Sequence, residues 1–242
     1  MPRFFITETP AVGDTVTLTG GDARHIAGAL RTRPGERLTL CDGAGTDYGC
    51  VVTAVEREAV CLTVETAVPN RSEPDLAVTL YMGLPKADKL EWIIQKAVEL
   101  GVTAIVPVET RRSIARVDPK DAAKKQERRQ RIADEAAGQS GRGIRPVVEP
   151  GIPWKTALTR LAGETAVICY EGGGVPLGEL PLPADRRVSL IVGPEGGFDP
   201  DEVAQVVAAG GKVATLGPRI LRCETAPLAA LTVLMERSGN MK

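Results

Sequence analysis

Short apolar runs alternate with polar turns along the N-terminal part of the chain. The runs of strand length are Arg3–Thr7, Thr15–Thr19, Arg37–Leu40, Gly49–Val55 and Val60–Glu65. Gly, Asp and Pro separate them, and one helical interval, Asp22–Leu30, interrupts the series. Short strands at this spacing are typical of a small barrel. The pattern predicts a β-barrel domain at residues 1–70.

The pattern changes after Val68–Asp75, a segment whose proline and polar residues are typical of a linker. Strand-like apolar runs now alternate with stretches of helical periodicity. Val78–Met82, the helical Leu90–Val98 and Val102–Val108 form the first such unit. Strand, helix and strand in this order form a βαβ crossover, which builds a parallel sheet. We therefore predict an α/β domain at residues 75–242.

The same alternation continues to the C-terminus. The elements expected are, in order, a helix from Pro119 to Ala137, a helix at Trp154–Leu161, strands at Ala166–Tyr170, Val188–Val192 and Val213–Leu216, and a last apolar helix at Leu228–Met235. A further helix begins after Asp199, because Asp199, Pro200 and Glu202 occupy the cap, first and capping-box positions. It ends at Gly210-Gly211. The last helix fits an internal core or a subunit interface equally well.

Glycine-rich turns follow three of these strands. They are Glu171–Gly174, Gly193–Gly197 and Gly217-Pro218. Glycine lets a backbone approach a ligand closely, so such loops side by side can build a pocket for a small, flat, adenine-bearing molecule; each could instead form only a tight turn. The absence of G-x-G-x-x-G and of G-x-x-x-x-G-K-[ST] argues against a Rossmann dinucleotide site and a P-loop.

The composition narrows the protein class. Hydrophobic residues make up 43% of the 242 residues and charged residues 25%, which is ordinary for globular proteins. No apolar run approaches the roughly 20 residues of a membrane span, and the start lacks the apolar core of a signal peptide, so we expect a cytoplasmic protein without membrane contact. The five cysteines never form C-x-x-C, so no metal site is indicated, and Cys223 is interpreted as a packing residue.

Positive charge is concentrated in one segment of a chain whose net charge is only −1. Between Arg111 and Arg145 lie 11 Lys and Arg residues against 5 Asp and Glu residues, a local excess of 11 − 5, or +6. A basic stripe on a nearly neutral protein is typical of a phosphate-binding face. The alternative is a solvated helix whose charges pair at i,i+4.

Four long motifs carry a resemblance to a known family. They are G-P-E-G-G-F at Gly193–Phe198, L-G-P-R-I-L-R-C-E-T-A at Leu216–Ala226, K-A-D-K-L-E-W-I-I-Q-K-A-V-E-L-G-V at Lys86–Val102, and E-A-A-G-Q-S-G-R at Glu135–Arg142. The chain resembles the SPOUT class of methyltransferases, and specifically the RsmE family, which methylates N3 of a uridine in 16S ribosomal RNA. The resemblance covers essentially the whole chain.

The resemblance implies a PUA-like RNA-binding β-barrel followed by a SPOUT α/β trefoil-knot domain, which is an exception to the rule against knotted chains. It also implies a homodimer. The implied partner is 16S ribosomal RNA, bound within the small ribosomal subunit. The knot would gather the three loops around S-adenosylmethionine without a metal. The residues implied in cofactor binding are Gly172, Gly173, Val192, Gly193, Pro194, Glu195, Gly196, Gly197, Leu216, Gly217, Ile220, Leu221 and Arg222.

Methylation at uracil N3 needs a proton acceptor and a group that stabilises negative charge on the uracil oxygens. Arg222 is expected in the second role. Glu195 or Glu224 is expected as the base, although either could equally pair with an arginine, and Glu224 could cap a helix. The side chains expected to contact RNA are Arg24, His25, Arg31, Arg111, Arg112, Arg116, Lys124, Arg128, Gln139 and Arg142.

Alternatives remain open at this stage. For His25, the single histidine, a local hydrogen bond is the favoured interpretation, because a lone histidine more often has that role than a catalytic one. The protein could also be a SPOUT enzyme for another RNA base, or a ribosome-assembly factor that binds RNA without catalysis.

Overall fold

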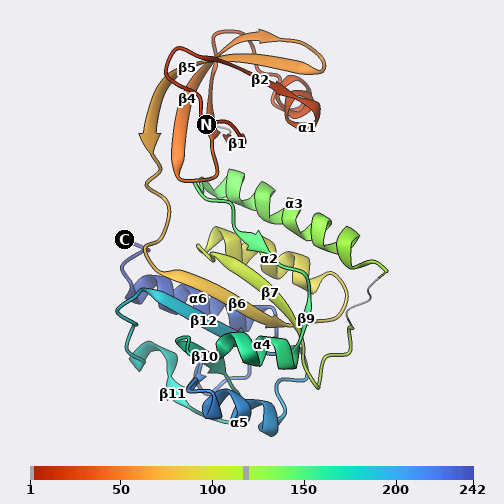
Figure 1. The fold of residues 1–242 in the computed structure, drawn as a ribbon, viewed down its shortest axis with the longest axis vertical. Coiled ribbons are helices and arrows are strands. Elements are labelled where there is room, and N and C mark those ends of the chain that lie inside the picture. The colour runs from red at the N-terminus through yellow and green to blue at the C-terminus, as the bar shows by residue number, and fades with distance from the viewer. Residues whose placement is uncertain (1–2, 117–119) are drawn as a thin grey trace. The chain divides into compact units, whose positions relative to one another are not determined.

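The computed structural model describes residues 3–116 and 120–242. The chain divides into two compact units, a first unit of Met1–Glu73 with Ala137–Arg145 and a second unit of Pro74–Ala136 with Pro146–Lys242 (Figure 1). The division falls between Glu73 and Pro74, within the segment that the composition indicates as a linker. The predicted ranges, 1–70 and 75–242, place Ala137–Arg145 in the second domain, whereas the structure groups this segment with the first unit.

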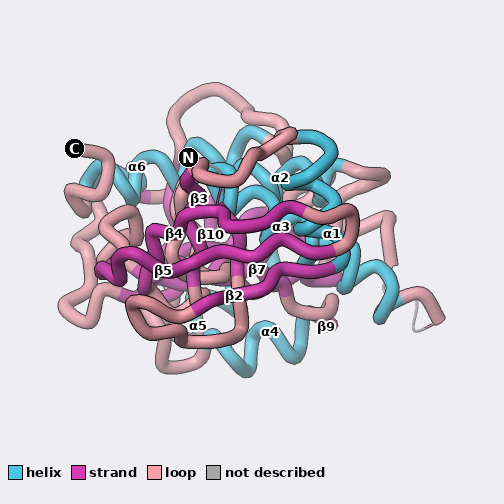
Figure 2. The backbone as a smooth tube through the Cα atoms, turned by 90° about the horizontal axis from the view of Figure 1, so that it is seen from above, coloured by secondary structure: helices cyan, strands magenta, loops and turns pink. Residues whose placement is uncertain are grey.

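The first unit is built on a five-stranded sheet. Its strands are β1 (Arg3–Phe5), β2 (Thr15–Thr19), β3 (Arg37–Cys41), β4 (Thr46–Val55) and β5 (Ala59–Pro69), in the order β1-β3-β4-β5-β2. Figure 2 shows β4, β5 and β2 running side by side. Two register shifts interrupt the β4–β5 ladder, at Gly49/Cys50 and Val52/Ala54, and such bulges bend a strand. The sheet thereby curls around a core of inward-facing apolar side chains.

The helical interval of the first unit begins earlier than its pattern predicts. It consists of α1 (Gly20–Arg24) followed by a π-helical turn, His25–Ala29. Ala23 and Ile26 are fully buried and attach it to the sheet.

The second unit is built on an eight-stranded sheet in which every pairing is parallel. Its strands are β6 (Ala77–Gly83), β7 (Ala104–Glu109), β8 (Val147–Val148), β9 (Ile152–Pro153), β10 (Ala166–Cys169), β11 (Val175–Pro176), β12 (Arg187–Val192) and β13 (Lys212–Thr215). The order is β11-β13-β10-β12-β6-β7-β8, with β9 also paired to β7. Every residue of β12 after Arg187 is buried, as its continuous apolar run predicts. The predicted α/β class with a parallel sheet is confirmed.

Helices cover both faces of this sheet. They are α2 (Lys89–Glu99), α4 (Trp154–Leu161), α5 (Pro200–Ala208) and α6 (Thr225–Arg237). A further helix, α3 (Ala122–Ser140), is hydrogen-bonded to the edge strand β8 through Gln126 and Gln130. α4 and α5 pack on the face that presents Tyr81 and Ile191, whereas α2 and α6 pack together on the opposite face (Figure 1). The predicted capping box of α5 is confirmed, because Asp199 accepts a backbone hydrogen bond from the first turn and Glu202 bonds back to Asp199 N.

Several element boundaries differ from the prediction. α6 begins at Thr225 rather than Leu228, and the predicted start of the basic helix at Pro119 lies outside the described residues. The two-residue strands β8, β9 and β11 were not predicted, because runs this short carry no measurable periodicity. Among the described residues, no helix has both the length and the apolar content needed to span a membrane.

Candidate functional site

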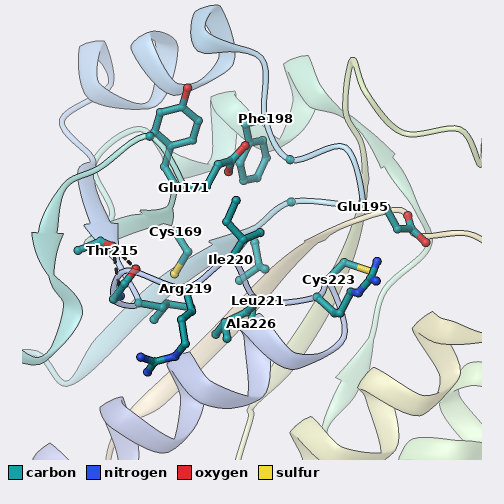
Figure 3. A pocket seen from close by; sticks show the side chains of 18 of the residues that line it. Cys169, Glu171, Glu195, Phe198, Thr215, Arg219, Ile220, Leu221, Cys223 and Ala226 are labelled. Atoms are coloured by element: carbon teal, nitrogen blue, oxygen red, sulfur yellow. Dashed lines mark hydrogen bonds between the residues drawn. The ribbon is translucent and has the colours of Figure 1, made fainter.

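A cavity of about 970 Å³ opens at the carboxyl ends of β10, β12 and β13 in the second unit (Figure 3). The chain leaves each of these parallel strands through a glycine-containing loop, and the three loops together line the cavity. Parallel strands place their carboxyl ends at one edge of a sheet, which is where α/β proteins bind ligands. All residues expected at the cofactor pocket are brought together here.

The cavity also includes residues that the sequence analysis did not select. They are Cys169, Tyr170, Glu171, Phe198, Thr215, Pro218, Arg219, Cys223 and Ala226. Six of the nine adjoin a residue expected at the pocket, whereas Cys169, Tyr170 and Ala226 lie two to four positions away in the chain.

Two glycines are required by the packing of the loops on one another. Gly197 has φ +63°, and a Cβ there would lie within 3.0 Å of the Glu171 carboxyl carbon. A Cβ at Gly83 would lie 2.7 Å from Pro194 N. The glycines therefore serve tight loop packing as well as the pocket, so the two interpretations of these turns are not exclusive.

One lysine connects the loops that bear the two expected carboxylates. Lys89 Nζ lies 3.1 Å from Glu195 Oε1 and 3.4 Å from Glu224 Oε2. Glu195 also accepts a hydrogen bond from Lys86 N at 3.1 Å. Both carboxylates therefore pair with a lysine rather than with the arginine that the sequence suggested. Glu195 lines the cavity, whereas Glu224 is absent from its wall.

These contacts keep both carboxylates ionised. Burial raises the pKa of Glu195, but hydrogen bonds from its own backbone, from Lys86 N and from Lys89 outweigh it and lower that pKa overall. The pKa of Glu224 is lowered mainly by the hydrogen bond from the Cys223 thiol, with a further contribution from Lys89. The hydrogen bond to Glu195 in turn raises the pKa of Lys89.

Lys89 was missed by the sequence analysis, although a signal was present. It is the first residue of α2, where the helix dipole disfavours a cation. In the structure, two carboxylates from distant loops offset this cost.

Cys223 is a packing residue in the structure. It is buried, and its thiol donates to Glu224 Oε2 at 2.9 Å. Burial, followed by this hydrogen bond and the nearby carboxylates, raises the pKa of Cys223 to about 12. A thiol held protonated in this way is a poor nucleophile.

The loop between β13 and α6 presents exposed side chains at the cavity. Arg219 and Arg222 are exposed, and neither guanidinium is paired to a carboxylate in the part of the chain that the structure describes. Ile220 is 86% exposed, which is unusual for a large apolar side chain and is typical of a surface that another molecule covers.

The basic residues expected at RNA in the second unit are exposed but mostly paired. Arg111 binds Asp199 at 2.7 Å and Asp201 at 3.0 Å at the start of α5, and Arg112 donates to Gly196 O at 3.1 Å in the cavity loop. Arg116 pairs with Glu109 and Arg128 with Glu91. Lys124 is exposed on α3. Arg111 and Arg112 thus hold the loop that follows β12, in addition to any role in RNA binding.

The first unit holds the other residues expected at RNA. Arg24, His25, Arg31 and Gln139 are exposed, with Arg24 paired to Glu58 and the His25 ring against the edge of Phe4. Arg142 differs from them, because it is only 3% exposed. Its guanidinium is held by Glu73 through Nε at 2.9 Å and Nη2 at 2.8 Å. This burial argues against the RNA contact expected for Arg142 and gives it a structural role.

Comparison with known proteins gives consistent matches over both units. A family model described as an RNA methyltransferase domain matches residues 72–235, and one described as an RNA methyltransferase PUA domain matches residues 18–65. The chain is 37% identical to ribosomal RNA small subunit methyltransferase E of Bacillus subtilis (strain 168), over 97% of this chain and 96% of that protein. It is 34% identical to the protein of the same name from Synechocystis sp., over 95% of this chain and 75% of that protein.

Solved structures are similar over the same length. A crystal structure of ribosomal RNA small subunit methyltransferase E from Neisseria gonorrhoeae, bound to S-adenosyl methionine, has a TM-score of 0.91 and 38% identity, covering 98% of this chain and 97% of that one. A methyltransferase from Legionella pneumophila in complex with the cofactor SAM has a TM-score of 0.89 and 29% identity, covering 97% and 96%.

Proposed function

Since the chain belongs to the ribosomal RNA small subunit methyltransferase E family, we propose that it transfers a methyl group from S-adenosylmethionine to N3 of a uridine in 16S ribosomal RNA. The observation that carries the proposal is the convergence of three strand-end loops on one cavity. The names of the relatives support ribosomal RNA of the small subunit as the substrate. The choice of uridine N3 rests on the motifs at Gly193–Phe198 and Leu216–Ala226.

The cavity suits the proposed cofactor. Its volume of about 970 Å³ lies at the upper end of the range of small-molecule pockets, which is about 300–1,000 Å³. Leu216, Ile220 and Leu221 provide an apolar surface for the adenine, and the adjacent loops provide backbone N–H and C=O groups for its polar edge. S-adenosylmethionine supplies a methyl group on a positively charged sulfur, so the protein needs to supply orientation and electrostatics only.

Arg222 is the proposed electrostatic group. Uracil N3 becomes nucleophilic when it loses its proton, and the negative charge then spreads onto the carbonyl oxygens. An exposed guanidinium at the cavity, with no paired carboxylate among the described residues, is free to bind these oxygens. Donors fixed where charge develops typically contribute about 10²–10³-fold in rate.

Glu195 is the proposed proton acceptor, in preference to Glu224. Glu195 is one of the residues that line the cavity, and its lowered pKa keeps it ionised at neutral pH. The same lowered pKa makes it a weak base, so its contribution depends on Arg222 stabilising the anion that forms. Glu224 lies outside the cavity wall and accepts from the Cys223 thiol, which favours a positioning role.

We also propose that two copies of the chain associate. The proposal rests on the family resemblance, which implies a homodimer. Sedimentation of the wild type tests this assembly: a dimer supports it, and a fully active monomer contradicts it.

The experiment that tests the function is mass-spectrometric mapping of ribosomal RNA methylation in cells that lack the protein. Loss of one N3-methyluridine from 16S RNA, restored by the wild type and not by Arg222→Gln, is the expected result. Loss of a methyl group from another base would indicate a different target. An unchanged RNA, together with no binding of S-adenosylmethionine to the purified protein, would indicate a non-catalytic assembly factor.

A further inference from the structure

A second cavity, of about 310 Å³, lies in the second unit beside the loop that follows β6. Leu84, Pro85, Ala87 and Asp88 form one wall. In the same loop, the Lys86 backbone N–H donates to Glu195 at the first cavity. Successive residues of one loop therefore contact both cavities.

The opposite wall is one face of α3. Ala122, Lys125 and Arg129 recur at i, i+3 and i+7, which places them on the same side of the helix. Arg116 and Ala115 complete this wall before the undescribed residues 117–119. Among the described lining residues, three are cationic and only Asp88 is anionic.

Arg129 differs from the other two cations in its contacts. Arg116 pairs with Glu109 at 3.0 Å, and Lys125 with Asp121 at 3.8 Å. Arg129 Nε is buried without a hydrogen-bond partner. The nearby Glu91 carboxylate is bound by Arg128 at 2.7 Å.

Such a guanidinium is costly in the free protein. Buried charges are normally paired, because desolvation of an unpaired charge is unfavourable. Burial lowers the pKa of Arg129, in agreement with its geometry, while the charge of Glu91 offsets this only in part. Binding of an anion to this unpaired guanidinium would therefore be favourable.

We propose that this cavity binds a backbone phosphate of the RNA substrate, with Arg129 as its principal ligand. The proposal rests on the proposed function, which supplies the RNA. A guanidinium presents parallel N–H donors that match two phosphate oxygens. Arg129 Nε itself is buried, so the donors proposed to meet the phosphate are the terminal Nη groups. The volume of about 310 Å³ is at the small end of ligand pockets, so it suits a phosphodiester group rather than a second cofactor.

The loop that contacts both cavities would link phosphate binding to the position of the RNA at the first cavity. A phosphate held by Arg129 in this cavity fixes the RNA one loop away from the cavity of Glu195 and Arg222. The strand would then be anchored next to the nucleotide that enters the first cavity. Free inorganic phosphate bound here would contact Arg129 but would not position a nucleotide.

The test compares wild type, Arg129→Met and Arg129→Lys with a charge-matched control, Arg187→Met. Arg187 is exposed at the amino end of β12, the sheet edge opposite the cavities. Affinity for a 16S RNA transcript is measured over a series of salt concentrations. Thermal midpoints are measured in parallel, with and without inorganic phosphate at constant ionic strength.

We expect Arg129→Met to bind the transcript about tenfold more weakly, with a salt slope reduced by about 1, and to bind S-adenosylmethionine as the wild type does. Arg129→Lys should keep most of the salt slope and lose part of the RNA affinity, because lysine keeps the charge but lacks the paired N–H donors of the guanidinium. The thermal midpoint of free Arg129→Met should be equal to or higher than that of the wild type. Arg187→Met should match the wild type in RNA affinity and in salt slope.

Three outcomes would overturn the inference. The first is an Arg129→Met protein whose RNA affinity and salt slope equal those of the wild type, and the second is an Arg187→Met protein that loses as much RNA affinity as Arg129→Met. The third is that inorganic phosphate stabilises the protein only when Arg129 is present, while RNA binding does not depend on Arg129. Methyl mapping separates this inference from the proposed function. If the wild type methylates uridine N3 and Arg129→Met binds RNA normally, only the phosphate site is wrong. If RNA binding depends on Arg129 but no methyl reaches N3, only the proposed target is wrong.

Discussion

Replacing Glu73 by Gln should destabilise the first unit severely without touching the cavity of the second. The Glu73 carboxylate accepts from Arg142 Nε and Nη2, from Gly143 N at 2.7 Å and from Ile144 N at 3.0 Å. It therefore holds Ala137–Arg145 to the rest of the unit.

The magnitude follows from the burial of the pair. The Arg142 side chain is 4% exposed and that of Glu73 16%, so solvent screens their attraction little. Removing one partner of a buried ion pair costs about 3–5 kcal/mol. We expect a loss of about 3 kcal/mol, at the low end, because Gln keeps one acceptor oxygen and Glu73 is partly exposed. Removing both charges in Glu73→Gln/Arg142→Met should recover part of this loss.

Hydrogen exchange measured by mass spectrometry is the suitable assay. Both tryptophans, Trp92 and Trp154, belong to the second unit, so their fluorescence would not report on the first. Peptides from residues 3–73 and 137–145 should lose protection in Glu73→Gln. Wild-type protection in this variant, or an Arg142→Met protein that folds normally but has a reduced salt slope for RNA, would refute the structural role of Arg142.

The pair also predicts a pH dependence. Burial raises the pKa of Glu73, but the hydrogen bonds from Arg142 and the backbone outweigh it and lower the pKa below its ordinary 4.5. The ionised form is therefore favoured in the folded protein. Its contribution to stability is complete above pH 4.5 and is lost as the pH falls through the folded pKa. Glu73→Gln should remove this acid-sensitive part of the stability.

Three predictions concern the cavity. Arg222→Lys should lower the single-turnover rate about 10²-fold while S-adenosylmethionine binding, measured by calorimetry, stays near wild type; equal losses in both would indicate a binding role. Gly197→Ala should weaken that binding at least tenfold, because φ is +63° and the Cβ would collide with Glu171, and wild-type affinity would contradict it. Lys89→Gln should raise the pKa of Glu195 and move the acidic limb of the pH–rate profile to higher pH; an unmoved limb would exclude Glu195 as the base.

Local patterns predicted the regular elements well. Strand β2 and helix α4 have the predicted bounds, and Asp199, Pro200 and Glu202 form the predicted capping box. These features depend on neighbours in the chain, which a sequence displays directly. The loops of the cavity were also predictable, because glycine after a buried strand is a local signal and parallel strands share one edge.

Contacts between distant segments were not predictable in this way. The Arg142–Glu73 pair joins residues 69 positions apart, and the Lys89–Glu195 contact crosses a larger distance in the chain. Arg142 has the same sequence signature whether it is buried against a carboxylate or exposed for RNA. The expectation of a knot rests on the family resemblance alone, since no periodicity encodes how a chain threads.

The basic segment shows why charge alone does not define an RNA site. Its excess of +6 counts only acids between Arg111 and Arg145, whereas the structure supplies partners from elsewhere: Asp199 and Asp201 for Arg111, Glu109 for Arg116, Glu91 for Arg128 and Glu73 for Arg142. A cation that already binds a carboxylate gives up that contact when it binds a phosphate, so its net gain is small. Among the described residues, Lys124, Arg129 and Arg145 of the segment have no ion pair to give up, and neither have Arg219 and Arg222 at the first cavity. The affinity and the salt dependence should therefore be concentrated in these unpaired cations rather than spread evenly along the stripe.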